Sequence, residues 1–112
     1  MEKKDLKPAG VFKYFEEICQ VPRPSKKEEK IIAYLKAFGV KHNLETNVDE
    51  AGNVLIKKPA TPGKENLQTV ILQSHIDMVC EKNNDVQHDF LTDPIETEID
   101  GEWLKAKGTT LG

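Results

Sequence analysis

Apolar side chains recur at helical spacing along the first part of the chain. Pro8 suits the first turn of a helix, because the N–H that proline lacks would have no partner there. After it, apolar residues repeat at steps of one, three and four. They are Val11, Phe12, Phe15, Ile18 and Cys19. This pattern predicts a helix with one apolar face, on which Cys19 is a small buried side chain.

A second amphipathic pattern follows the proline-rich stretch 21–24, which should stop the first helix because a residue before proline is pushed out of the helical region. Ser25 and Glu28 have the spacing of a capping box, in which each side chain bonds a backbone N–H at the helix start. The apolar face consists of Ile31, Ile32, Leu35 and Phe38. We expect this helix to end at Gly39, or to pass through it and end near Asn43, since both residues tolerate a left-handed conformation.

From residue 44 onward the apolar period changes to two, or to short continuous runs. Residues 44–48 and 53–57 are predicted to be strands, joined by a turn that contains Asp49 and Gly52. Residues 96–100 and 102–105 indicate a second hairpin around Asp100-Gly101, a dipeptide favoured by type I′ turns.

Three segments separate these hairpins. Residues 58–66, with two prolines and a glycine, predict a surface loop. Residues 69–74 form an apolar run short enough for a buried strand. Residues 81–88 are polar and predict another loop. Helices followed by strands indicate an α/β fold, two helices packed on a mixed β-sheet. Residues 107–112 are loop-like, so no helix would cover the second sheet face, and we expect residues 1–112 to be part of a larger domain, incomplete on its own.

Composition narrows the class of protein. A hydrophobic fraction of 38% and a charged fraction of 31% are typical of a globular domain. The net charge is -3, and lysines stand beside acidic residues, so no concentrated basic face is expected for nucleic acid or an anionic membrane. Neither a signal peptide nor a membrane-spanning run is visible, and two cysteines are too few for a disulfide scaffold. These features predict a cytoplasmic protein.

The candidate chemistry lies where the apolar run ends. His75 follows residues 69–74, and Asp77 lies two positions further on. Ligands gather at the carboxyl ends of strands in open α/β sheets, and residues two apart on extended backbone point to the same side. A neutral imidazole can bind a metal through one nitrogen while a carboxylate holds its other N–H. The pair predicts a metal ligand, His75, with Asp77 as its partner. The alternative is a hydrogen-bonded histidine at a strand end, with Asp77 capping a turn.

Other polar residues are weaker candidates. His42 should be a helix cap or a surface group, and His88 should be exposed in its polar loop. Cys80 could join His75 at a zinc ion, but no second cysteine pair stands at finger spacing. Residues 108–110 resemble half of a phosphate loop and lack its remaining glycine and lysine. Trp103 is expected to pack on the sheet with its N–H satisfied at the edge.

Several blocks of the chain resemble the aminoacyl-histidine dipeptidases, also called Xaa-His dipeptidases or cytosol non-specific dipeptidases. The central block is Gln73-Ser74-His75-Ile76-Asp77-Met78-Val79. The others are residues 18–19, 22–25, 52–56, 58–61, 82–85, 88–90, 100–103 and 107–112. The resemblance covers nearly the whole chain, and several blocks are specific to this branch of the carboxypeptidase-like and aminoacylase-like hydrolases.

The resemblance implies a zinc peptidase that hydrolyses unblocked dipeptides, including Xaa-His dipeptides such as carnosine. It implies two metal ions in a catalytic domain, usually zinc, with cobalt or manganese as further metals that suit imidazole and carboxylate ligands. His75 matches the first metal ligand of the family, and Asp77 matches an acidic residue counted among the catalytic ones. Residues 1–112 would be the N-terminal portion of that domain, without the inserted lid domain. A homodimer of the full-length protein would be compatible with the resemblance.

In the family, the block at residues 108–112 continues into Ala-Asp-Asn-Gly, whose aspartate bridges the metals. The paired glutamates and the later ligands lie further on as well. We therefore expect the 112-residue segment alone to be inactive. Two alternatives stay open at this point: a related aminoacylase or deacetylase, and a non-catalytic binding module or truncated paralogue.

Overall fold

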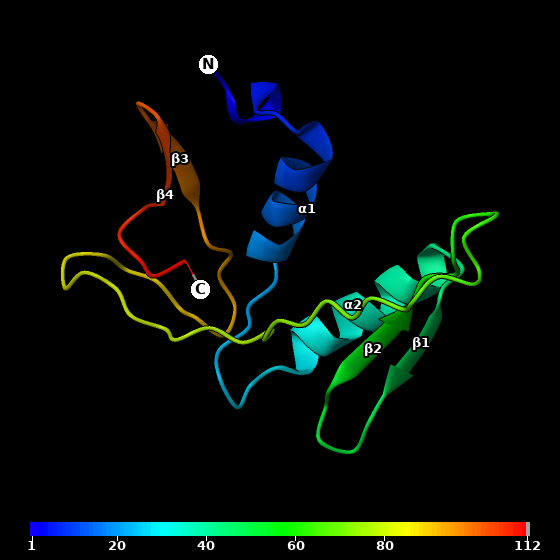
Figure 1. The fold of residues 1–112 in the computed structure, drawn as a ribbon. Helices are drawn as coiled ribbons and strands as arrows, with labels where there is room; N and C mark the ends of the chain where they lie inside the picture. Colours follow the sequence, from blue (N-terminus) through cyan, green and yellow to red (C-terminus); the bar gives the residue numbers. More distant parts are fainter. Residues whose placement is uncertain (112) are drawn as a thin grey trace. The chain divides into compact units, whose positions relative to one another are not determined.

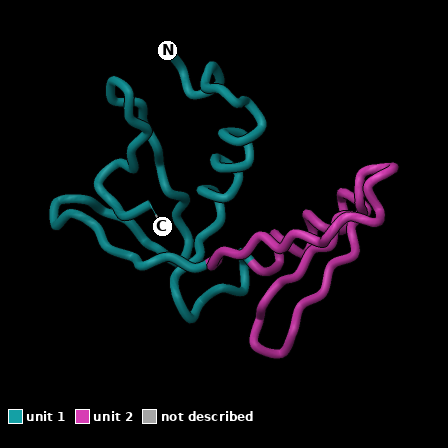
Figure 2. Tube along the Cα trace, in the orientation of Figure 1, with its two compact units in different colours: residues 1–31, 77–112 teal, residues 32–76 magenta. Residues whose placement is uncertain are grey.

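A computed structural model describes residues 1–111 (Figure 1). Its elements, in chain order, are η1 (Lys3–Asp5), α1 (Ala9–Cys19), α2 (Glu29–Lys41), β1 (Glu45–Val48), β2 (Val54–Lys57), β3 (Thr97–Asp100) and β4 (Trp103–Ala106). The chain divides into unit 1, Met1–Ile31 with Asp77–Gly112, and unit 2, Ile32–Ile76 (Figure 2). The α/β class is confirmed. Gly112, the last residue of the block 107–112, lies outside the described residues.

The core of unit 1 forms where α1 meets the segments around Met78 and Ile95. Cys19, at the end of α1, is fully buried, as its position on the apolar face predicted. It packs with Met78 and Ile95. The Ile95 backbone N–H donates to the Cys19 carbonyl at 2.9 Å, which ties the end of α1 to the approach to β3. Partly buried residues surround this cluster: Phe15, Cys80, Phe90, Ala106 and Leu111.

A polar contact ties η1, α1 and β3 together. The Thr97 hydroxyl, on a residue that is 4% exposed, donates to Glu16 Oε1 at 2.5 Å. Lys3 Nζ donates both to Glu16 Oε2 and to Thr97 Oγ1, each at 3.0 Å. Buried polar groups are stable only when they are hydrogen-bonded, and here each of the three side chains satisfies the other two.

Replacing Thr97 with valine should therefore destabilise unit 1. Thr97→Val keeps the shape of the side chain but removes a donor from Glu16 and an acceptor from Lys3, so we expect the free energy of unfolding to fall by about 1–3 kcal/mol. Chemical denaturation of the complete gene product would measure it. Thr61→Val, on an exposed loop, is the control and should change the value by less than about 0.5 kcal/mol. Equal effects of the two substitutions would contradict the structural role of Thr97.

The start of α2 differs from the sequence prediction. The helix begins at Glu29, and the side chains of Ser25 and Glu28 bond Asp77 and the Lys26 N–H in place of the two backbone N–H groups of the predicted capping box. Lys26 has a positive φ of 69°, which breaks the backbone path that a capping box requires. Glu28 Oε1 accepts from the Lys26 N–H at 2.8 Å, and the Ser25 hydroxyl bonds elsewhere.

The end of α2 follows the second of the two predicted alternatives. The helix passes through Gly39 and ends at Lys41, and Asn43 adopts the left-handed conformation with φ 55°. Gly39 is needed for a different reason. A Cβ atom at this position would lie 1.8 Å from Thr46 Oγ1 and 2.9 Å from Thr46 Cβ, so the Thr46 side chain on β1 occupies the space that a side chain at position 39 would need.

Gly39→Ala should destabilise unit 2, although alanine has the higher helix propensity. The added methyl group must displace Thr46, and overpacking of this kind costs about 1–3 kcal/mol. Gly10→Ala is a matched control, because Gly10 is also helical and nothing lies within 4 Å of its added Cβ. We expect Gly10→Ala to stabilise by about 0.5 kcal/mol. Thermal unfolding of the two variants would measure opposite shifts, and a stabilised Gly39→Ala would refute the close contact.

Both predicted hairpins are confirmed. β1 and β2 pair antiparallel with Glu45 opposite Lys57, and Gly52 in their turn has φ 89°. The Asp49 carboxylate accepts from the Ala51 and Asn53 N–H groups, and its hydrogen bonds with Asn53 lower the pKa of Asp49.

β3 and β4 pair antiparallel around Gly101, with Thr97 opposite Ala106. Of the two central turn residues, only Gly101 has a positive φ, at 61°. This fits a type II′ turn and corrects the predicted type I′, which needs positive φ at both positions. Trp103 at the start of β4 is 73% exposed, so the prediction that it packs on the sheet is wrong.

The prediction of a buried strand at residues 69–74 is wrong. These residues form no strand, and Val70, Ile71 and Leu72 are 78%, 81% and 92% exposed. A strand requires a hydrogen-bonded neighbour, and within residues 1–111 the named strands form two separate antiparallel pairs, not one mixed sheet. Periodicity identified an apolar run but could not provide its neighbours. Among the described helices, none is long and apolar enough to cross a membrane.

Candidate functional site

Three segments that are distant in sequence meet in unit 1, and we call them the junction: residues 23–25, 77–81 and 109–111. The first two pair in parallel, with Met78 N–H donating to the Arg23 carbonyl at 2.9 Å and Ser25 N–H donating to the Met78 carbonyl at 3.2 Å. The third is joined through Thr110, whose hydroxyl donates to the Val79 carbonyl at 2.7 Å. The junction unites three of the blocks on which the family resemblance rests.

Asp77 is held firmly in the junction. Its carboxylate oxygen Oδ2 accepts the Ser25 hydroxyl at 2.5 Å, and the same hydroxyl lies 3.3 Å from the Met78 carbonyl. Asp77 is half-buried, and the residue that follows it is in the core. The contact with Ser25 was not predicted, because the Ser25–Glu28 spacing indicated a helix cap. The only sequence signal was that both residues belong to family-resembling blocks.

Arg23 ties the junction to its third segment. It is 9% exposed, and its Nη2 donates to the Leu111 carbonyl at 3.0 Å. Within residues 1–111 its buried Nη1 has no hydrogen-bond partner. A guanidinium group presents five N–H donors in a rigid fork. Arg23 therefore holds the backbone at Leu111 beside the segment that carries Asp77.

His75 lies at the end of the extended apolar segment, as predicted, and its side chain is exposed. The boundary between the units falls after Ile76, so His75 belongs to unit 2 and Asp77 to unit 1. An exposed imidazole followed two residues later by an anchored carboxylate is a donor set that suits zinc. Within residues 1–111, no three His, Cys, Asp or Glu side chains are grouped closely enough to hold a metal ion. Residues 1–111 therefore do not by themselves supply a complete ligand set for a metal ion.

The weaker candidates have structural roles or surface positions. His42 is exposed with its ring 4.3 Å from that of Phe38, as expected of a surface group. Burial raises the pKa of the Cys80 thiol, which disfavours the thiolate that zinc requires. In the loop 108–110, the Thr110 N–H donates to the Glu81 carbonyl, so this N–H is used within the junction and not for a phosphate.

His88 differs from its prediction. It was expected to be exposed, yet it is half-buried with its ring 4.5 Å from that of Phe90. The polar composition of the loop was misleading, because Val86 and Phe90 turn part of it inward. Val86 also packs against Gly108, where an added Cβ would lie 2.5 Å from Val86 Cγ2.

Comparison with known proteins agrees with the family resemblance. No family model matches the chain. The chain is 48% identical over 111 residues to the cytosol non-specific dipeptidase of Escherichia coli (strain K12). The crystal structure of aminoacylhistidine dipeptidase from Vibrio alginolyticus matches all of the chain with a TM-score of 0.95 and 51% identity.

The chain spans 23% of the length of each of these two proteins. The match extends over 99% of this chain in the first case and 100% in the second, so it includes the junction and residues 69–77. The resemblance predicted from the sequence blocks is thereby confirmed: along its whole length, this chain is similar to a segment of the aminoacylhistidine dipeptidases.

Proposed function

We propose that this chain is the N-terminal portion of the catalytic domain of a metal-dependent dipeptidase. In this proposal His75 is a zinc ligand and Asp77 is the carboxylate that orients its imidazole. The observation that carries it is the anchoring of Asp77 by Ser25 at 2.5 Å, two positions after the exposed imidazole of His75. The names of the two similar proteins support the peptidase assignment.

The geometry of Asp77 suits an orienting role. A histidine that binds a metal through one nitrogen usually donates its other N–H to a carboxylate, which fixes the ring and raises its basicity. Ser25 does not orient the imidazole itself. Its hydroxyl donates to Asp77 Oδ2 and so restrains rotation of the Asp77 side chain. Because a carboxylate has two oxygens with several lone pairs, bonding to Ser25 is compatible with accepting an imidazole N–H.

The substrate class follows from the same proposal. A bound zinc ion supplies an activated water molecule and polarises the peptide carbonyl. The chain's own contribution is to hold one ligand, His75, through Asp77, and to hold the backbone at Leu111 through Arg23. We propose unblocked dipeptides as substrates, including Xaa-His dipeptides such as carnosine, with two zinc ions in the complete site and a homodimer as the assembly.

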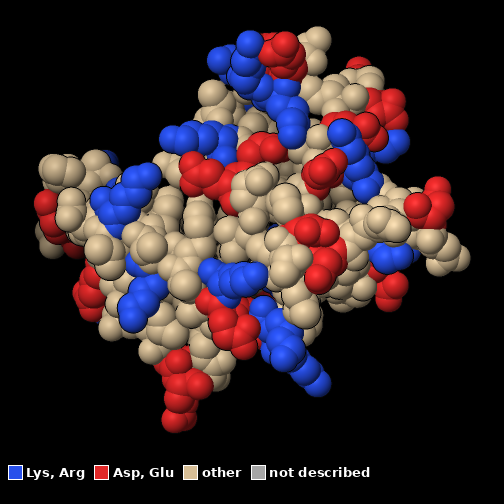
Figure 3. All heavy atoms as spheres, turned by 180° about the vertical axis from the view of Figure 1, so that it is seen from behind, with Lys and Arg blue, Asp and Glu red and all other residues tan. Residues whose placement is uncertain are grey.

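The proposed location is the cytoplasm, in keeping with the name of the Escherichia coli protein. Neither nucleic acid nor a membrane is proposed as a partner. On the face drawn in Figure 3, basic and acidic side chains are interspersed, which gives no concentrated basic surface.

The function is tested by supplying the complete gene product with dipeptides and with their N-acetylated forms. We expect release of free amino acids from L-alanyl-L-histidine and carnosine, loss of that activity after chelation, and its recovery when zinc is returned. The N-acetylated dipeptides should not be cleaved. Cleavage of the blocked forms would instead support an aminoacylase or deacetylase, and cleavage of neither would favour a non-catalytic module.

A further inference from the structure

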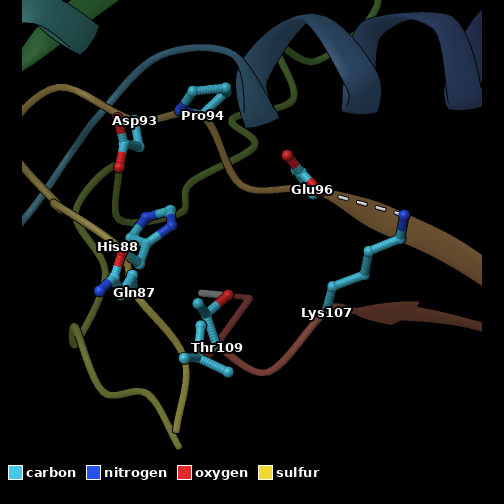
Figure 4. A pocket seen from close by; sticks show the side chains of 8 residues that line it. Gln87, His88, Asp93, Pro94, Glu96, Lys107 and Thr109 are labelled. Carbon is cyan, nitrogen blue, oxygen red and sulfur yellow. Dashed lines mark ion pairs between the residues drawn. The ribbon is translucent and has the colours of Figure 1, made fainter.

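A polar cavity lies in unit 1, between residues 86–94 and the segments that flank the base of the β3–β4 hairpin. Its volume is about 340 Å³. The residues that line it include neither His75 nor Asp77; they are Val86, Gln87, His88, Asp93, Pro94, Glu96, Lys107 and Thr109 (Figure 4). Backbone hydrogen bonds build its walls: Lys107 N–H donates to the Glu96 carbonyl and Asn83 N–H to the Gly108 carbonyl, both at 2.9 Å.

Two opposite charges stand together on the wall of this cavity. Lys107 Nζ lies 4.0 Å from Glu96 Oε2, at the outer limit of an ion pair (Figure 4). The two side chains are 50% and 71% exposed, so their attraction is screened by water and easily exchanged for other partners. The backbone bond between the same two residues holds the bases of both side chains in place.

The remaining wall is polar and partly rigid. The imidazole of His88 forms part of it, with its ring tilted against that of Phe90, and its buried Nε2 has no hydrogen-bond partner within residues 1–111. The Asp93 carboxylate is tied into its own turn, with Oδ2 accepting the Asp89 N–H at 2.8 Å. The Thr109 hydroxyl donates to the Thr110 carbonyl, so the Thr109 hydroxyl oxygen can still accept a hydrogen bond.

This arrangement matches a small zwitterion better than a simple ion. An anion alone would be repelled by Glu96 and Asp93, and a metal ion would lack a ligand set, since no group of three His, Cys, Asp or Glu among the described residues could hold one. In an α-amino acid, a single carbon joins the ammonium and carboxylate groups. Their spacing is therefore close to that of the Lys107 and Glu96 charges, and both ends can be paired at once.

We propose that this cavity binds a free α-amino acid. Its carboxylate accepts from Lys107 Nζ, its ammonium donates to Glu96, and its side chain lies toward Val86 and Pro94. Free amino acids are the products of the activity proposed above, so the physiological meaning of this site, a response to product, rests on the proposed function. Binding itself does not depend on that function.

The test measures binding of L-alanine to the complete gene product with the His75→Ala substitution, which removes the proposed zinc ligand. Titration calorimetry should show saturable binding, and the imidazole resonances of His88 should shift in NMR spectra on adding L-alanine. Lys107→Met and Glu96→Gln should each weaken binding at least tenfold. Lys105→Met is the matched control, because Lys105 lies on β4 two residues before Lys107 and pairs with Asp100 outside the cavity. It should bind L-alanine unchanged.

Two further probes decide the ligand class. N-acetyl-L-alanine lacks the ammonium and L-alaninamide lacks the carboxylate, and each should bind at least tenfold more weakly than L-alanine. Equal binding of N-acetyl-L-alanine, equal effects of Lys107→Met and Lys105→Met, or no saturable binding of L-alanine would overturn the proposal. Absence of dipeptidase activity in the unmodified gene product, together with retained L-alanine binding by His75→Ala, would contradict the proposed function alone. Circular dichroism of each variant establishes that it is folded.

Discussion

The His75→Ala variant of the complete gene product is expected to lose both bound zinc and dipeptide hydrolysis. An alanine methyl group offers no lone pair to a metal, and the remaining ligands would have to hold the ion at an incomplete site. We expect kcat/KM for L-alanyl-L-histidine to fall by at least about a hundredfold, because activation of water depends on the metal. Elemental analysis of the purified variant should show a parallel loss of zinc.

The control for this experiment is His42→Ala. His42 is exposed and its ring lies against that of Phe38, so its removal should leave zinc content and kcat/KM close to those of the unmodified protein. If His75→Ala kept the zinc content and the activity of His42→Ala, the imidazole at position 75 would not be a metal ligand.

The Asp77→Asn variant is expected to bind zinc about ten- to a hundredfold more weakly, the usual effect of removing a partner that orients a metal ligand. Asparagine has nearly the shape of aspartate but lacks the negative charge, so it accepts an imidazole N–H more weakly and no longer raises the basicity of the ring. Competition with a fluorescent zinc chelator would measure this affinity. Asp85→Asn, in the exposed loop before Val86, is the control and should bind zinc normally.

The Ser25→Ala variant separates the anchoring of Asp77 by the Ser25 hydroxyl from the backbone pairing within the junction. It removes the hydroxyl that bonds Asp77 Oδ2, while the backbone bonds of Arg23 and Ser25 with Met78 remain. Zinc affinity should therefore fall less than in Asp77→Asn. An affinity loss in Ser25→Ala that exceeds that of Asp77→Asn would mean that the hydroxyl acts on the metal site by a route other than Asp77.

Some structural features of this chain depend only on residues that are close together in the sequence. The helix α1, the buried Cys19 and both hairpins were predicted from spacing and turn residues alone, because helical periodicity, strand alternation and glycine turns depend on neighbours in sequence, whereas Val11 of the predicted apolar face is exposed. The end of α2 near Asn43 was one of two predicted alternatives for the same reason. The family resemblance, with His75 and Asp77 as its candidates, also came from short local blocks.

The tertiary structure decided how these elements use their side chains. Ser25 had the spacing of a helix cap, yet its hydroxyl bonds Asp77, a residue 52 positions away. His88 turned inward because Phe90 packs against it, whereas Trp103 and residues 69–74 stayed exposed because no other element among residues 1–111 covers them. A hydrogen bond or a buried surface needs a partner from elsewhere in the chain. The periodicity of one segment carries no information about that partner. The contact between Ser25 and Asp77 and the cavity beside Glu96 and Lys107 could therefore be identified only from the tertiary structure.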